Sequence, residues 1–219
     1  MCALASDWPV AQGKEGRYMD NPANNDYPIH DLLRNRWSPR AFANRPIEQE
    51  KILRLLEAAR WAPSSYNEQP WAFILATHEQ PAEYARVLSC LIEFNQGWAK
   101  AAPVLMLGVA HLTFDRNQQP NRHATHDLGA AAANFTTQAT AEGLFVHQMA
   151  GIVPDKARAE FHIPEGWEAM TAIAVGYPGD TNSLPDELRK RETGPRSRKA
   201  LASFVFTGNW ATPSPILSN

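Results

Sequence analysis

The stretch Ala62-Pro63-Ser64-Ser65-Tyr66-Asn67-Glu68-Gln69-Pro70-Trp71 follows a helical pattern and leads into an apolar run, residues 71–76, that is typical of a buried strand. Pro63 ends the helix, and Pro70 restrains the entry to the strand. A plain connector does not require this much fixed backbone together with two hydroxyls and an amide. The alternative is a helix-to-strand loop with Ser and Asn caps.

Helical and strand patterns alternate on both sides of this stretch. The clearest helix covers 47–61, where apolar side chains fall on one face and charged ones on the other. Apolar runs predict further strands, of which 103–110 is apolar throughout and therefore central. The remaining predicted elements are helices over 29–36, 82–94, 125–142 and 154–161, strands over 144–147 and 169–177, and a polar loop over 111–124. The alternation predicts an α/β or α+β sandwich.

Length and composition suit one globular domain. The chain has 219 residues, of which 44% are hydrophobic. We expect an irregular N-terminal arm over 1–26, a single domain over 27–210 and a C-terminal tail over 211–219. Residues 195–210 combine a basic run with apolar side chains near the chain end, which need a partner surface to bury them.

Charge and cysteine usage exclude several classes of protein. A net charge of −2 gives no field that points to nucleic acid or a membrane. The two cysteines, Cys2 and Cys90, form no disulfide framework or zinc spacing, which fits a reducing cytosol. The N-terminus has no signal-peptide pattern, and no apolar run approaches the ~20 residues of a membrane span. We therefore expect a cytoplasmic protein.

The chemical signal is a set of anion-binding side chains. No Rossmann or P-loop glycine pattern and no nucleophile elbow is present. His123, His126 and Asp127 match no tight metal-ligand spacing, and His147 is interpreted as a core histidine. What remains are hydroxyl, amide and guanidinium groups in three clusters: Arg36, Ser38 and Arg40; Ser64, Ser65 and Asn67; Arg196 and Arg198. A phosphorylated cofactor explains such a set better than a catalytic triad does.

With these motifs the chain resembles the FMN-dependent nitroreductase family of NAD(P)H:acceptor oxidoreductases. The resemblance covers about 29–210. Four motifs carry it in order, namely Arg36-Trp37-Ser38-Pro39-Arg40-Ala41-Phe42, the Ala62–Trp71 stretch, His147-Gln148-Met149-Ala150-Gly151, and Arg196-Ser197-Arg198-Lys199 with Phe204-Val205-Phe206 after it.

The resemblance implies a role for each matching residue. Those expected to bind FMN phosphate and ribityl, with Trp37 in the same motif, are Arg36, Ser38, Arg196 and Arg198. Arg40 would lie near flavin N1 and O2, and Asn95 would face the pyrimidine edge. The residues expected to reach the flavin of the other subunit are Pro63, Ser64, Ser65 and Asn67. The amides of Ala150 and Gly151 would lie near N5 and O4. No side chain is named as catalytic, and no metal is expected.

The resemblance also implies a fold and a mechanism. The fold is an α+β three-layer sandwich with a mixed, mainly antiparallel sheet, in an intertwined homodimer with two FMN sites. The small-residue segment 128–133 would lie at the dimer core, and 195–210 would embrace the partner. NADH or NADPH reduces FMN, and the flavin then reduces a small acceptor such as a nitroaromatic or a quinone in a ping-pong mechanism.

Other outcomes remain open on the same fold. Relatives of this family catalyse reductive dehalogenation, flavin degradation or azoline oxidation, and the loop 111–126 would decide the substrate. The side chains of this loop that could hold a carboxylate are Arg116, Arg122, His123 and His126. A flavin-binding carrier or sensor without enzymatic activity is a further alternative.

Overall fold

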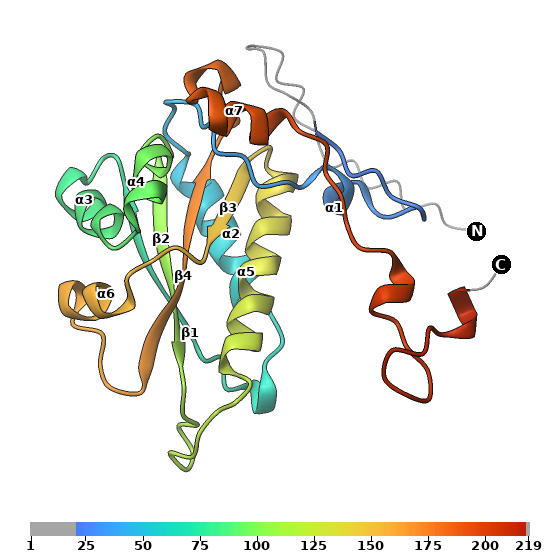
Figure 1. Cartoon of the computed structure of the whole chain (residues 1–219). Helices are drawn as coiled ribbons and strands as arrows, with labels where there is room; N and C mark the ends of the chain where they lie inside the picture. The colour runs from blue at the N-terminus through green and yellow to red at the C-terminus, as the bar shows by residue number, and fades with distance from the viewer. Residues whose placement is uncertain (1–20, 218–219) are drawn as a thin grey trace, which may run out of the picture.

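The computed structural model describes residues 21–217 of the chain (Figure 1). Its helices are α1 Asp31–Asn35, α2 Gln49–Arg60, α3 Pro81–Ser89, α4 Glu93–Ala99, α5 Ala124–Ala141, α6 Pro154–Phe161 and α7 Asp186–Thr193. Its strands are β1 Trp71–Thr77, β2 Val104–His111, β3 Phe145–Met149 and β4 Trp167–Gly176. Short 3-10 turns are formed by Ser65–Asn67, Thr181–Ser183, Leu201–Ser203 and Pro215–Leu217.

The four strands form one sheet in the order β1-β2-β4-β3, and every neighbouring pair is antiparallel. The sheet pairs Phe73 with Gly108 and Met106 with Ile173. An antiparallel sheet with helices on both faces is an α+β sandwich, as predicted, and not a parallel α/β fold. The apolar run 103–110 corresponds to β2, a central strand, because it lies between β1 and β4.

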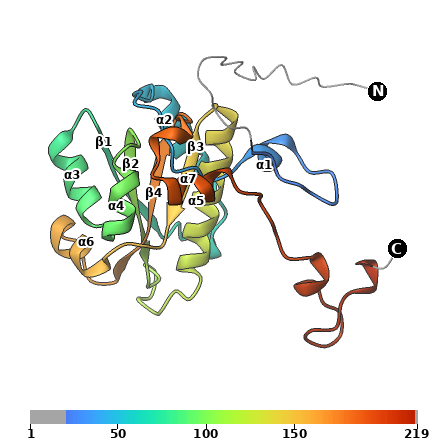
Figure 2. The same cartoon turned by 45° about the horizontal axis from the view of Figure 1, so that its top comes forward.

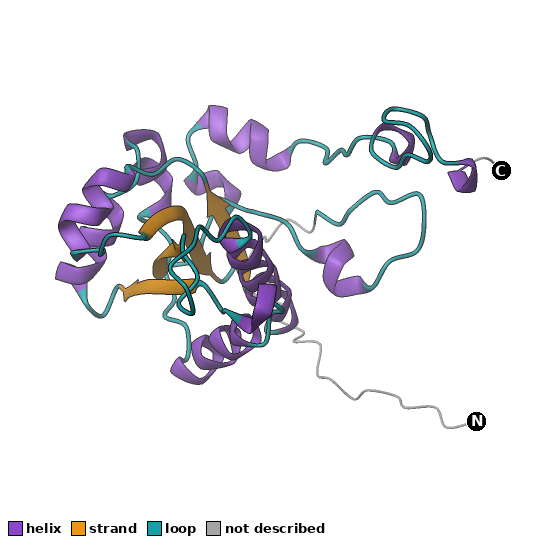
Figure 3. Ribbon diagram, turned by 90° about the horizontal axis from the view of Figure 1, so that it is seen from below, coloured by secondary structure: helices purple, strands orange, loops and turns teal. Residues whose placement is uncertain are grey.

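Helices cover both faces of the sheet and make three layers (Figure 3). Successive side chains of a strand point to opposite faces. Accordingly Leu105 and Leu107 pack in the cluster that includes α3, α4 and α6, whereas Val104 and Met106 pack against α2 and α5. The alternation explains why β2 is apolar throughout, since both of its faces are buried.

The predicted helix over 82–94 is wrong in its length, because two helices occupy this region. Helix α3 ends at Ser89 and α4 begins at Glu93, and between them Leu91 forms an isolated bridge with Ile152. The amide of Ile92 donates to the carbonyl of Gly151 at 3.1 Å. This pairing with a distant segment interrupts the helix and places α4 beside the end of β3.

The two ends of the chain differ in what can be described. Of the predicted N-terminal arm 1–26, residues 1–20 lie outside the described residues, and 21–26 form no regular element. Of the predicted tail, residues 218–219 lie outside them as well. After α7 the chain passes the segment that follows α1, and residues 201–217 then project away from the sandwich (Figures 1 and 2). None of the helices between residues 21 and 217 has the length and apolar character that a membrane crossing requires.

Candidate functional site

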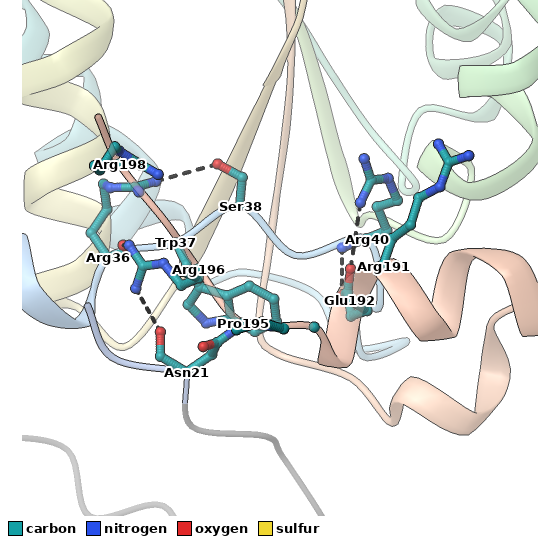
Figure 4. Close-up of a pocket in the computed structure, with 11 residues that line it drawn as sticks. Asn21, Arg36, Trp37, Ser38, Arg40, Arg191, Glu192, Pro195, Arg196 and Arg198 are labelled. Carbon is teal, nitrogen blue, oxygen red and sulfur yellow. Dashed lines mark hydrogen bonds and ion pairs between the residues drawn. The ribbon is translucent and has the colours of Figure 1, made fainter. Parts of the chain in front are cut away.

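A polar cavity of about 220 Å³ lies where the segment after α1 meets the segment after α7 (Figure 4). Six of the residues predicted to bind the cofactor line it, together with Glu192 of α7. The lining consists of Asn21, Arg36, Trp37, Ser38, Arg40, Arg191, Glu192, Gly194, Pro195, Arg196 and Arg198. Two motifs that are about 160 residues apart in the sequence are thereby brought to one place, as the hydrogen bond between Arg196 and the Arg36 carbonyl shows.

The cavity concentrates positive charge. Arg36 Nη1 donates to Ser38 Oγ at 3.3 Å, and the guanidinium groups of Arg196 and Arg198 lie nearby. Burial lowers the pKa of Arg36 from its ordinary value, and the charges of Arg196 and Arg198 lower it further. Among the described residues no carboxylate forms an ion pair with any of these three arginines. Such a cluster favours an anion that neutralises it, and guanidinium forks match a phosphate.

Besides lining the cavity, Arg196 stabilises its wall through hydrogen bonds to the backbone. Its Nη1 donates to the carbonyl of Asn21 at 2.5 Å, and its Nη2 donates to the carbonyl of Arg36 at 2.8 Å. These bonds tie the start of the C-terminal segment to the segment that carries Arg36. Arg36 and Arg198, whose side chains make no such bond to a distant carbonyl, are therefore better placed to contact a phosphate directly.

Arg40 lies at the other side of the cavity, beside Glu192 (Figure 4). Its amide donates to Glu192 Oε1 at 2.7 Å, and its Nη1 lies 3.8 Å from Glu192 Oε2. Its Cζ lies 5.8 Å from the ring centroid of Trp98, a cation–π arrangement. Three buried polar atoms of the cavity lining have no hydrogen-bond partner in the described structure: Trp37 Nε1, Arg40 Nε and Glu192 Oε2. A buried polar atom without a hydrogen-bond partner lowers the stability of the protein. The two N–H donors and the carboxylate acceptor are therefore available to a ligand.

His147 anchors the motif from the sheet side. Its Nδ1–H donates to the carbonyl of Pro39 at 2.9 Å, and its ring centroid lies 4.6 Å from that of Trp98. Burial lowers the pKa of His147 to about 4, and the charge of Arg40 acts in the same direction. The imidazole is therefore neutral near pH 7. This agrees with the interpretation of a core histidine, since its proton serves the backbone.

Asn95, Ala150 and Gly151 meet at the junction of α4 and β3. Asn95 is 8% exposed, its Nδ2 donates to the carbonyl of Gly151 at 3.1 Å, and its Oδ1 accepts from Trp98 Nε1 at 3.3 Å. The side chain is thus occupied in supporting Gly151. A Cβ on Gly151 would lie 2.4 Å from Asn95 Nδ2 and 2.7 Å from Ile92 Cδ1, so a side chain there would have to displace both of these side chains. Ala150 beside it is exposed.

The remaining predicted residues, Pro63, Ser64, Ser65 and Asn67, lie at the opposite end of α5. The amide of Ser65 donates to Oδ2 of Asp127, in the first turn of α5, at 2.9 Å. The cavity lies near the other end of that helix, because Trp37 contacts Phe145, four residues after its last residue. At ~1.5 Å per residue the helix separates the two places by roughly 25 Å. One chain therefore does not bring the two groups together.

The backbone of this distant stretch is unusual. Tyr66, Asn67 and Gln69 have φ angles of 55°, 56° and 51°, in the left-handed region that residues other than glycine rarely adopt. Ser64 Oγ accepts from the amide of Gln69 at 2.9 Å and closes the turn. The sequence indicated that the Ala62–Trp71 stretch is more than a plain connector, and three residues with strained backbone lie within it. Strained residues of this kind are common in functional loops.

The histidines near the start of α5 form no ligand set. Asp127 uses its oxygens for the Ser65 amide and for His126 Nδ1, at 2.9 and 3.1 Å. Within residues 21–217 no three side chains of the types that ligate metals come together.

The sequence did not reveal Glu192 as a residue of the cavity, nor the lining residues Asn21, Arg191 and Gly194. Glu192 lies in α7, and no helix was predicted there because the segment 186–199 is so rich in basic residues. The available signal was the spacing of Leu188 and Glu192, four residues apart and hence on one helical face. Both are buried, at 7% and 2% exposure.

An α+β sandwich with an arginine-lined polar cavity at one end suits a protein that binds a phosphorylated cofactor. The sequence model of the Nitroreductase family matches residues 33–177. The chain belongs to this family.

Individual relatives cover most of the chain. A crystal structure described as an oxidoreductase containing FMN is 34% identical and superimposes with a TM-score of 0.82, over 89% of this chain and 98% of that chain. An uncharacterized 15.4 kDa protein of Mycolicibacterium smegmatis is 34% identical over 58% of this chain and 84% of its own length. The major NAD(P)H-flavin oxidoreductase of Aliivibrio fischeri is 27% identical over 81% of this chain and 96% of its own length.

Proposed function

We propose that this protein is an FMN-dependent NAD(P)H oxidoreductase that reduces an electron-poor acceptor, such as a nitroaromatic or a quinone. The observation that carries the proposal is that Arg36 and Arg198 line the cavity with Ser38 Oγ beside them, and that neither guanidinium forms an ion pair with a carboxylate of the described residues. The A. fischeri relative, named an NAD(P)H-flavin oxidoreductase, and the FMN-containing structure support the choice of cofactor.

The donor set fits FMN. Guanidinium and hydroxyl groups suit its phosphate, while Trp37 Nε1, Arg40 Nε and Glu192 Oε2 are buried atoms that lack partners and suit ribityl hydroxyls or the ring edge. When bound, FMN would accept a hydride from NAD(P)H and pass it to the acceptor, so that the two substrates use the site in turn. The residues of this chain bind and orient the cofactor, and Arg40 supplies a positive charge at the site.

No side chain of the site is proposed as a general acid. His147 is neutral near pH 7, and its Nδ1 proton is committed to the Pro39 carbonyl. Asn95 is committed to Gly151 and Trp98 in the same way. Protons for the acceptor would come from water, and the protein would contribute binding and electrostatics.

We further propose that the active form is a homodimer in which Ser64, Ser65 and Asn67 complete the cofactor site of the other subunit. The cavity of about 220 Å³ is smaller than the ~300–1,000 Å³ of typical small-molecule sites, so one chain supplies part of a site. The separation along α5 keeps the 63–67 segment from the cavity of its own chain. On the outer side of α5, Gly129 and Ala133 are exposed, and a Cβ on Gly129 would meet nothing within 4 Å.

The C-terminal segment supports the same assembly. Phe204, Trp210 and Ile216 are 57%, 89% and 84% exposed on a segment that leaves the body (Figure 2). Exposed apolar side chains gathered on one segment are typical of an interaction surface. A second copy of the chain would bury them, as in obligate dimers.

The test is a titration of purified protein with FMN, followed by anaerobic addition of NADH or NADPH and a panel of acceptors. We expect a yellow protein that loses its colour with the reductant and regains it with a nitroaromatic or a quinone. Arg198→Ala is expected to weaken FMN binding, whereas Arg189→Ala, an exposed arginine of α7 paired with Asp186, is the matched control. A wild-type protein that takes up no FMN would refute the proposal.

A further inference from the structure

Glu192 is a buried carboxylate in the wall of the cavity, and its two oxygens have different surroundings. Oε1 accepts from the amides of Arg40 and Ala41, at 2.7 and 3.0 Å. Oε2 has no hydrogen-bond partner and lies 3.8 Å from Arg40 Nη1. Only 1% of the Glu192 side chain is exposed, so solvent does not screen its charge. A negative charge therefore lies next to the guanidinium of Arg40 without forming a close pair.

The backbone that carries Arg40 is fixed on every side. The carbonyl of Pro39 accepts from His147, and the carbonyl of Ala41 accepts from the amide of Gly179 at 2.9 Å. A Cβ on Gly179 would lie 2.5 Å from the carbonyl carbon of Phe42, so the two segments are in close contact. With its backbone held in this way, Arg40 responds to a ligand through its side chain, while its backbone amide keeps the bond to Glu192 Oε1.

We propose that Glu192 is a positioning residue that both aims Arg40 and limits the positive charge that Arg40 presents to the cofactor. This inference rests on the proposed function. A reduced flavin carries more negative charge than an oxidised one, so a nearby cation binds the reduced form more tightly. A buried carboxylate 3.8 Å from that cation opposes the preference, and at short range in a protein interior the opposition is strong. Glu192 thus keeps the two redox forms closer in affinity than Arg40 alone would.

The test is Glu192→Gln, which keeps an amide oxygen for the Arg40 and Ala41 N–H groups but removes the charge. Oxidised FMN is titrated by fluorescence, and the midpoint potential of bound FMN gives the affinity of the reduced form. We expect the ratio of the dissociation constants, oxidised over reduced, to rise about tenfold, which equals a potential about 30 mV more positive for a two-electron couple. The matched control is Asp186→Asn, which removes one charge from an exposed side chain of the same helix and should leave the ratio unchanged.

Two results would overturn the inference: a lower ratio, or an unchanged ratio, which includes the equal weakening of both forms that a purely structural role predicts. Thermal unfolding of each variant shows whether it is folded. If Glu192→Gln does not fold, Glu192→Asp replaces it, since the shorter side chain withdraws the charge from Arg40. The ratio should then rise about threefold, and no rise would reject the inference. A wild-type protein that binds no FMN refutes the proposed function instead, so the two failures are distinct.

Discussion

The amide of Ser65 donates a 2.9 Å hydrogen bond to Oδ2 of Asp127 and thereby fixes the 63–67 segment to the first turn of α5. The arginine-lined cavity lies at the other end of this helix. The bond therefore holds a set of polar side chains away from the cavity of their own chain. In a homodimer the same bond would hold them toward the partner, and this arrangement can be tested by mixing subunits.

The first prediction concerns complementation between two inactive variants. Asn67→Gly removes an amide while keeping the positive φ, and Arg36→Ala removes a cavity cation. We expect each homodimer to bind FMN poorly. A mixed dimer should recover one normal site, because the intact cavity of one chain meets the intact 63–67 segment of the other. FMN stoichiometry after co-expression with two different tags measures this.

The control for complementation mixes Arg36→Ala with Arg198→Ala, two changes in the same cavity. No mixed dimer of these variants contains an intact cavity, so no recovery is expected. Recovery in the control, or none in the first mixture, would contradict a site shared between subunits.

The second prediction separates phosphate binding from ring binding. Arg36→Ala should lower FMN affinity about 10-fold to 100-fold, because a charge-assisted hydrogen bond to phosphate is lost. Riboflavin lacks the phosphate, so its affinity should change little. Quenching of flavin fluorescence measures both. Arg34→Ala, an exposed neighbour that pairs with Asp31, should leave both affinities unchanged. Equal loss for FMN and riboflavin would assign Arg36 to the ring or to folding.

The third prediction concerns pH and stability. The pKa of His147 is lowered from 6.5 to about 4 in the native protein. Well above pH 6.5 the imidazole is neutral in both states, so the pKa difference does not affect the free energy of unfolding there. As the pH falls from 6.5 toward 4, the unfolded chain takes up a proton that the native one does not, so the free energy of unfolding should fall by up to about 3 kcal/mol.

Urea unfolding at a series of pH values measures this loss. His147→Asn keeps a donor for the Pro39 carbonyl but cannot titrate, so its stability should depend less on pH over this range. His162→Asn changes an exposed histidine with a φ of 51°, which asparagine tolerates, and should keep the wild-type slope. If His147→Asn has the wild-type slope too, another group causes the acid sensitivity.

The fourth prediction concerns the choice of acceptor. The Cζ of Arg116 lies 4.1 Å from the ring centroid of Tyr66 and 5.2 Å from that of Phe114, so the loop after β2 rests on the 63–67 segment. If that segment reaches the partner's site, Arg116 lies near the acceptor. Arg116→Ala should then raise KM about threefold for a nitrobenzoate, with little change for neutral nitrobenzene, because an exposed charge attracts only modestly.

Arg122→Ala is the matched control, since it removes an exposed cation of the same region. It should leave both KM values unchanged. A rise of equal size for the charged and the neutral acceptor after Arg116→Ala would mean that the residue shapes the loop and does not select charge.

The fold was largely predictable because its signals are local. The periodicity over 47–61 predicted α2, and the apolar run 103–110 predicted β2 with nearly correct ends. The break between α3 and α4 was not predictable in the same way. It depends on the bridge between Leu91 and Ile152, which are distant in the sequence, and helical periodicity carries no information about such pairing.

The site was predictable in composition but not in hydrogen bonding. The two arginine motifs were assigned together, and the structure places them around one cavity. Asn95 is expected to face the flavin pyrimidine edge, and the sequence did not indicate that its amide donates to the Gly151 carbonyl. Glu192 stands among lysines and arginines in the sequence. Such a charge pattern indicates a helix exposed to solvent, so it did not predict that one face of α7 is buried. Tertiary contacts decide which polar groups form hydrogen bonds within the protein and which remain available to a ligand.

The neighbouring positions 150 and 151 have unequal freedom to change. A side chain at 151 would collide with Asn95 and Ile92, whereas Ala150 is exposed beside it. Substitutions at this junction, in evolution or in a mutant library, should therefore be tolerated more readily at position 150 than at position 151. A library at 150 should yield many folded proteins, whereas one at 151 should yield fewer, because each variant has to displace Asn95 and Ile92.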